Sequence, residues 1–260
     1  MSGNRLTVII PSRVQDDQML FLNRSVGSIR RQVLSGQFDV NIIVAVDQGD
    51  MLDPQICRNL GIQCIESHGK SQAAALNSAI RKLDCDYVAF LEDDDRWQPQ
   101  FLQVAAQALD IGGFVSSNQI IYDEHGDIVR FLDFPTPSGW IMAYDTVSRV
   151  GEFNETFRFH IDNEWLGRLN LSGVTRVHLL EHYAPLDLAV LAQDRVQIRQ
   201  MLEATQNRIH VLRHEFLFPL VQRFAHSNSG MAQIMTDPDK QAVSIAEYER
   251  LIQQFGRVPI

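Results

Sequence analysis

Short apolar runs alternate with amphipathic segments along the first 120 residues, and this alternation restricts the fold more than any other feature of the chain. Residues 6–10, 41–46 and 86–91 are predicted strands, and residues 62–65 a shorter one, because each run is rich in apolar side chains. Nearly continuous apolar runs are typical of parallel strands that are covered on both faces. The pattern therefore predicts an α/β fold, with a sheet flanked by helices.

Helical periodicity separates these predicted strands. Leu22, Val26, Ile29 and Val33 follow one another at spacings of four, three and four residues, which places them on one face of a helix. Ser71 precedes a second, alanine-rich helix and is suited to cap it. Both helices are expected to pack on the sheet.

The pattern changes in the middle of the chain. Residues 114–122 and 128–132 are predicted strands of a hairpin, joined by the turn-forming cluster 123–127. Farther along, six side chains recur at spacings of four and three and predict one face of a long helix: Ile198, Leu202, Thr205, Ile209, Leu212 and Phe216. We therefore expect an α/β domain over residues 1–185 and a helical C-terminal extension over residues 186–260, which packs on that domain or mediates formation of a homodimer.

Charge and cysteine content exclude several classes of protein. The chain carries 23 Lys and Arg against 32 Asp and Glu, a net charge of −9, so it lacks the positive field of a nucleic-acid-binding protein. Its three cysteines lack metal-ligand spacing, which argues against a disulfide framework or a zinc ribbon and for a cytoplasmic location. No apolar run approaches the roughly 20 residues of a membrane span, so a membrane-spanning helix is not expected. Peripheral contact with the inner face of a membrane stays open.

Four consecutive acidic residues, 92–95, directly follow the predicted strand 86–91. Like charges about 4 Å apart repel by roughly 4 kcal/mol at an effective dielectric constant of about 20, so the cluster needs compensation. Ligands of open α/β sheets bind at the carboxyl ends of strands, where carboxylate oxygens suit Mg²⁺ or Mn²⁺. A divalent-metal site that binds a diphosphate is therefore predicted, with Arg13 and Lys70 adding positive charge. The structural alternatives are a solvated acidic turn and two ordinary surface cations.

Four segments resemble, in the same order, the family 2 glycosyltransferases of the GT-A fold. Residues 7–13 (TVIIPSR) are similar to the family's opening strand and loop, and residues 44–49 (VAVDQG) to its second strand. Residues 73–77 (AAALN) resemble the small-residue helix that follows, and residues 90–97 (FLEDDDRW) the metal-binding DXD segment. The resemblance implies a Rossmann-like mixed sheet flanked by helices.

The resemblance also implies which residues bind the donor. By it, Asp47 contacts the nucleotide base, Asp93 the ribose and Asp94 the metal, with Asp95 nearby as a further metal ligand. Glu92 stands where the family usually has Asp, so the roles within this acidic run stay open. Mn²⁺ or Mg²⁺ is the implied cofactor. The expected nucleotide-binding residues are Pro11, Ser12, Arg13, Asp47, Lys70 and Asp93.

A late histidine completes the metal site in some GT-A enzymes. His182 is expected in that role in preference to His178, and a structural role is the alternative for both. On the acceptor side, Trp140 is predicted to stack on a sugar face, with core packing as its alternative.

The segment 160–168 resembles the region of the family's catalytic base. Asp162 aligns with the aspartate of its Glu-Asp motif, although Ile161 replaces the usual Glu. From the residues alone, Asp162 could equally cap a helix or stabilise its first turn. Glu164 is the alternative base and an expected acceptor-side residue.

The implied reaction is inverting transfer of a sugar from a UDP-, GDP- or dTDP-sugar to a hydroxyl group of a carbohydrate or another acceptor, as in polysaccharide biosynthesis. A catalytically degenerate GT-A scaffold is the non-enzymatic alternative. A sugar nucleotidyltransferase is less favoured, because residues 11–13 (PSR) lack the expected glycine-rich, basic loop. A dinucleotide-dependent dehydrogenase is disfavoured because the same turn lacks a GxGxxG motif.

Overall fold

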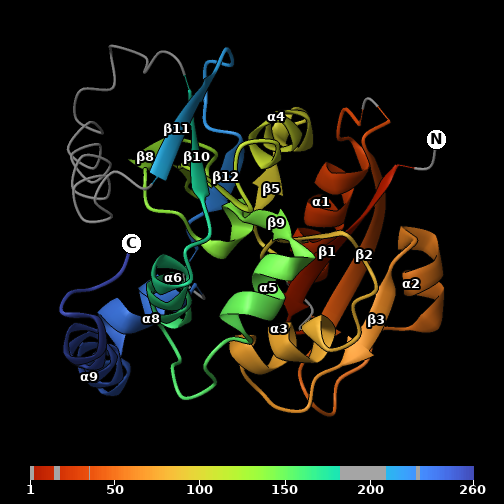
Figure 1. Cartoon of the computed structure of the whole chain (residues 1–260). Helices are drawn as coiled ribbons and strands as arrows, with labels where there is room; N and C mark the ends of the chain where they lie inside the picture. Colours follow the sequence, from red (N-terminus) through yellow and green to blue (C-terminus); the bar gives the residue numbers. More distant parts are fainter. Residues whose placement is uncertain (1–2, 15–17, 35, 182–208, 227–228) are drawn as a thin grey trace.

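The computed structural model describes residues 3–14, 18–34, 36–181, 209–226 and 229–260 (Figure 1). Within these residues, eight strands form a mixed sheet in which β9 is antiparallel to both neighbours while the other pairs are parallel. In sheet order the strands are β11 (Ile209–His214), β10 (Arg176–Glu181), β6 (Phe114–Ser117), β9 (Ile141–Ala143), β4 (Tyr87–Phe90), β1 (Asn4–Ser12), β2 (Phe38–Val46) and β3 (Gln63–Glu66). The predicted α/β architecture is confirmed.

Helices cover both faces of this sheet, and its two central strands, β9 and β4, are accordingly apolar along their length. Side chains of α1, α2 and α4 pack on one face, and those of α3, α5 and α6 on the other. Ser71 caps α3 as predicted, whereas α1 ends before Val33, which is exposed. These helices are α1 (Gln18–Arg30), α2 (Pro54–Leu60), α3 (Gln72–Ile80), α4 (Phe101–Leu109), α5 (Tyr144–Val150) and α6 (Ile161–Leu171).

A second, four-stranded sheet in the order β5-β12-β7-β8 adjoins the acidic run. The predicted hairpin is confirmed, because β7 and β8 pair antiparallel through the turn at residues 123–127. The run 114–122, expected as one strand, is two strands that belong to different sheets, with the chain leaving β6 at Asn118. The bounds are β5 (Arg96–Trp97), β12 (Val221–Phe224), β7 (Gln119–Tyr122) and β8 (Ile128–Leu132).

The prediction of a long helix near the C-terminus is wrong for the last part of the predicted range. Ile198, Leu202 and Thr205 lie outside the described residues, but Ile209–His214 forms β11, which pairs parallel with β10. The open edge of β10 offers backbone partners to a run that contains β-branched residues, and this pairing overrides the helical spacing. Beyond residue 208 the chain therefore completes both sheets before it becomes helical.

The helical part of the C-terminal segment contacts the core of the sheet domain. Leu251 of α9 (Pro238–Phe255) is buried in the core beside α6, and a Cβ on Gly167 would lie 2.5 Å from the Phe255 ring. A short helix, α8 (Gly230–Thr236), precedes α9. Dimerisation stays a prediction. Among the described helices, none combines the length and the apolar character needed to cross a bilayer.

Candidate active site

The acidic run lies at the carboxyl end of β4, where it offers a set of hard oxygen ligands. Carboxylate oxygens of Glu92, Asp94 and Asp95 lie within 4.8 Å of one another. Asp95 is fully buried, accepts a 2.5 Å hydrogen bond from the Ser138 hydroxyl, and its Oδ1 has no hydrogen-bond partner among the described residues. A buried carboxylate oxygen without a donor suits Mg²⁺ or Mn²⁺, so the residues present fit the predicted ion.

Asp93 is held differently from its neighbours. Its Oδ2 accepts a 2.6 Å hydrogen bond from Ser12 at the end of β1. Burial and the charge of Asp94 raise the pKa of Asp93 to about 7. Burial also raises the pKa of Asp95 well above its ordinary value, despite the opposing charge of Arg223. Without a bound cation, Asp93 and Asp95 therefore retain protons in a range where ordinary carboxylates are ionised.

Two residues of the C-terminal segment contact this cluster, and neither was predicted from the sequence. Arg223 of β12 places a guanidinium nitrogen 2.7 Å from Oε2 of Glu92 and another 3.2 Å from Oδ2 of Asp95. Burial acts to lower the pKa of Arg223, but the charges of Asp95 and Glu92 raise it overall. His226 Nε2 lies 2.8 Å from Oδ2 of Asp94, and this hydrogen bond raises the pKa of His226.

The predicted nucleotide-binding residues gather at the carboxyl ends of the neighbouring strands. Pro11 and Ser12 end β1, Asp47 directly follows β2, and Lys70 precedes the Ser71 cap of α3. Burial raises the pKa of Asp47, while the charges of Arg13 and Lys70 oppose that rise. These three charged groups are thus within electrostatic range of one another. Parallel strands bring their carboxyl ends to one edge of a sheet, which is where α/β folds bind ligands.

Asp162 reaches the same site from the other half of the chain. It lies in the first turn of α6, is partly buried, and its Oδ1 accepts the backbone N–H of Asn163. Burial raises the pKa of Asp162 to about 6, and the nearby charge of Glu92 acts in the same direction. The carboxylate is therefore mostly ionised at pH 7, yet more basic than an ordinary aspartate.

A contact from α9 positions the start of α6, and the sequence offered no signal for it. The buried Glu247 carboxylate accepts the backbone N–H groups of Arg158, Phe159 and His160 at 2.5 to 3.1 Å. The His160 ring lies 2.9 Å from the Ser244 hydroxyl on the same helix. α9 thereby anchors the backbone that leads into the turn carrying the predicted base.

Both predicted acceptor-side residues are buried, and the prediction for them is wrong. Trp140 is fully buried among aromatic rings that include Phe114 and Trp165, and its Nε1 donates to the backbone carbonyl of Pro135. It therefore offers no open face to a sugar. Glu164 is 2% exposed and accepts hydrogen bonds from Arg168, which removes it as the alternative base.

The histidine assignment also changes. His178 is fully buried, its Nδ1 lies 2.9 Å from the Ser116 hydroxyl, and burial lowers its pKa to about 3. It is therefore a neutral structural residue. His182 lies outside the described residues. Of the described histidines, His226 is the one that contacts the acidic run.

The sequence profile of glycosyl transferase family 2 matches residues 7–168, more than half of the chain. The chain belongs to glycosyl transferase family 2. The predicted family is thus confirmed, and its members are glycosyltransferases. No curated protein sequence matches this chain.

Solved structures of TarS from S. aureus share the fold of this family 2 chain. A structure of TarS residues 1–349 in complex with UDP-GlcNAc superposes with a TM-score of 0.59 at 15% identity, covering 95% of this chain and 66% of that one. The corresponding UDP complex superposes with a TM-score of 0.56 at 13% identity, covering 96% of this chain and 72% of that one. A longer TarS chain also superposes with a TM-score of 0.56 at 13% identity, and this chain spans 43% of its length. The likeness confirms the GT-A-type fold.

Proposed function

We propose that this family 2 chain transfers a sugar from a nucleoside-diphosphate sugar to an acceptor hydroxyl with inversion at the anomeric carbon. One observation carries the proposal: Asp162 lies within electrostatic range of Glu92 and Arg223, although about 60 to 70 residues separate it from either in the sequence. A candidate base and a candidate site for the leaving diphosphate are therefore neighbours at one edge of the sheet.

The donor is held by residues at the carboxyl ends of β1, β2 and β4. Asp47 receives the base and Asp93, steadied by Ser12, the ribose, while Arg13 and Lys70 balance the phosphate charge. The TarS structures with UDP and UDP-GlcNAc support a uridine nucleotide as the first donor to test.

Glu92, Asp94 and Asp95 are proposed to hold Mg²⁺ or Mn²⁺, with His226 in the role that the resemblance had suggested for His182. When bound, the ion supplies positive charge to the departing diphosphate. Arg223 places a permanent cation beside the same carboxylates, so it balances their charge.

Asp162 is proposed as the base that takes the proton of the acceptor hydroxyl. As the oxygen forms its bond to the anomeric carbon, its proton moves to the carboxylate while the diphosphate leaves from the opposite face of the sugar. A pKa of about 6 favours this role, because the base is ionised at pH 7 while its affinity for a proton exceeds that of an ordinary aspartate.

Donor turnover tests the proposal. With UDP-GlcNAc and Mg²⁺, and with water as the hydroxyl acceptor of the sugar, slow release of UDP is expected from the unmodified protein and is expected to fall at least a hundredfold in Asp162→Asn. UDP affinity should stay within about twofold, because the base does not hold the nucleotide. Asp39→Asn, at an exposed position on β2, is the matched control. Unchanged turnover in Asp162→Asn would remove Asp162 from the reaction.

A further inference from the structure

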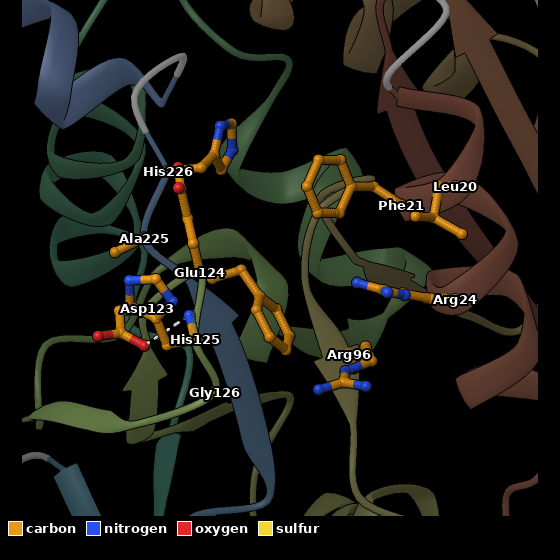
Figure 2. A pocket seen from close by; sticks show the side chains of 11 residues that line it. Leu20, Phe21, Arg24, Arg96, Asp123, Glu124, His125, Gly126, Ala225 and His226 are labelled. Atoms are coloured by element: carbon orange, nitrogen blue, oxygen red, sulfur yellow. Dashed lines mark hydrogen bonds between the residues drawn. The ribbon is translucent and has the colours of Figure 1, made fainter.

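A cavity of about 440 Å³ adjoins the acidic run, between α1, the β7–β8 turn and the end of β12 (Figure 2). His226 forms part of its wall and is shared with the candidate metal site, because its imidazole contacts Asp94. The ring of Phe21 stacks on the same imidazole at 5.4 Å. Asp47 and Lys70, on the nucleotide side, are not among the described residues that line this cavity. The cavity therefore adjoins the proposed metal site but is not lined by these two proposed nucleotide-binding residues.

Two arginines line one side of the cavity. Arg24 of α1 and Arg96 of β5 lie on the same side, facing the turn at residues 123–126 (Figure 2). The Arg96 guanidinium lies 4.3 Å from the centre of the Phe224 ring, which holds it in place. Its Nε is buried and has no hydrogen-bond partner within the described part of the chain.

Among the described residues, no ion pair balances the charges on this side. No salt bridge within the described part of the chain reaches Arg24 or Arg96, whereas Arg223 nearby has two. Like charges placed close together repel each other unless an anion lies between them. Guanidinium groups so placed suit a phosphate, which they bind through paired hydrogen bonds.

The other walls of the cavity offer carboxylates and apolar surface, which suit the hydroxyl groups and the carbon skeleton of a polyol or sugar that carries the phosphate. Opposite the arginines, Asp123 accepts the backbone N–H groups of His125 and Asp127, so the turn is ordered, and Glu124 and His125 lie beside it. Carboxylates in such a wall can accept hydrogen bonds from hydroxyl groups. Leu20, Phe21 and Phe224 line the cavity with apolar surface, on which the carbon face of a sugar or polyol can pack.

We propose that this cavity binds a phosphate group carried by the acceptor, so that the acceptor is a phosphorylated polyol or sugar. The inference rests on the proposed function, because it names the acceptor of the same reaction. The phosphate lies against Arg24 and Arg96, and the hydroxyl-bearing part faces the carboxylates of the turn. Because His226 is common to both sites, an acceptor bound here adjoins the donor. The alternative occupant of this cavity is the diphosphate of the donor, and the test below distinguishes it from a phosphate carried by the acceptor.

The first arm of the test measures the cavity alone. Binding of glycerol 3-phosphate is followed by saturation-transfer difference NMR in EDTA, with glycerol as the uncharged control. The unmodified protein is expected to bind the phosphate ester and not glycerol. Arg24→Gln, at an exposed position, and Arg24→Gln/Arg96→Gln should each weaken binding at least tenfold, whereas Arg257→Gln, at an exposed position near the C-terminus, should not.

The second arm separates acceptor from donor by calorimetric titration of UDP in Mg²⁺. UDP affinity is expected to stay within about twofold in both arginine variants. A parallel loss of UDP affinity would assign the cavity to the donor diphosphate and overturn the proposal. Failure of glycerol 3-phosphate to bind, or equal binding to all variants, would also overturn it. If the unmodified protein binds glycerol 3-phosphate but not UDP, the proposed function fails while the anion site stands.

Discussion

His226 donates a hydrogen bond from Nε2 to Oδ2 of Asp94, 2.8 Å away in space and 132 residues earlier in the sequence. The contact exists because β12 runs antiparallel to β5, the strand that directly follows the acidic run. The same strand carries Arg223 to Glu92 and Asp95. The C-terminal segment therefore takes part in the candidate metal site.

Replacing His226 should weaken metal-dependent nucleotide binding. We expect His226→Gln to reduce UDP affinity in Mg²⁺ by about ten- to a hundredfold, the range found when groups that hold a metal site are removed. UDP affinity in EDTA should change little. Calorimetry with and without the ion measures both quantities. His210→Gln, on the exposed side of β11, is the control, and equal affinities in Mg²⁺ would exclude the assignment.

The rate of transfer should fall on the acidic side of neutrality. Asp162 must be ionised to accept a proton and its pKa is about 6, so kcat should decrease tenfold per pH unit well below pH 6 and level off above pH 7. Initial rates at saturating UDP-GlcNAc and Mg²⁺ measure this profile. The residual rate of Asp162→Asn should not show this decrease below pH 6. If the rate of the variant decreases over the same pH range, a group other than Asp162 titrates there.

The stability of the metal-free protein should fall as pH rises towards 8. Asp93 titrates near 7 in the folded protein against 3.8 for an ordinary aspartate, so between these values the native state binds more protons than the unfolded state. Each unit of such a shift corresponds to about 1.4 kcal/mol. Urea unfolding in EDTA from pH 5 to pH 8 measures the slope.

Asp93→Asn separates this effect from general alkaline instability. The variant should be more stable than the unmodified protein at pH 8, because it buries no charge at that position, and its stability should depend less on pH. Asp39→Asn, which alters an exposed carboxylate, should keep the original slope. Parallel slopes in all three proteins would contradict the raised pKa of Asp93.

Removing the Glu247 carboxylate should lower the rate without affecting the donor site. Glu247→Ala leaves three backbone N–H groups before α6 without their acceptor, which should destabilise the fold by about 2 to 4 kcal/mol and loosen the turn that holds Asp162. We expect kcat to fall at least tenfold while UDP affinity stays within about twofold. Glu249→Ala, at an exposed position on the same helix, should leave both unchanged.

Local sequence patterns predicted the strands and the helix cap around the proposed donor site. Apolar runs predicted β1, β2 and β4, Ser71 predicted the cap of α3, and the run 92–95 follows β4 as expected. These features depend on neighbours within a few residues. In a parallel sheet, strand ends then meet at one edge without further information.

The acceptor side depended on contacts that local patterns do not contain. A tryptophan such as Trp140 can stack on the face of a sugar. Here, however, Trp140 is surrounded by aromatic rings of the core, so it packs inward. Residues 209–214 carry a helical spacing, but the open edge of β10 makes them a strand.

The sequence by itself determined the α/β architecture, the family and the position of the acidic run at a strand end, because periodicity and turn residues act over short stretches. Only the tertiary structure decided that His226 and Arg223 contact that run, that Glu247 holds the turn before Asp162, and that Arg24 and Arg96 face one cavity. The physical reason is that burial and charge pairing depend on which distant segments become neighbours in the folded chain.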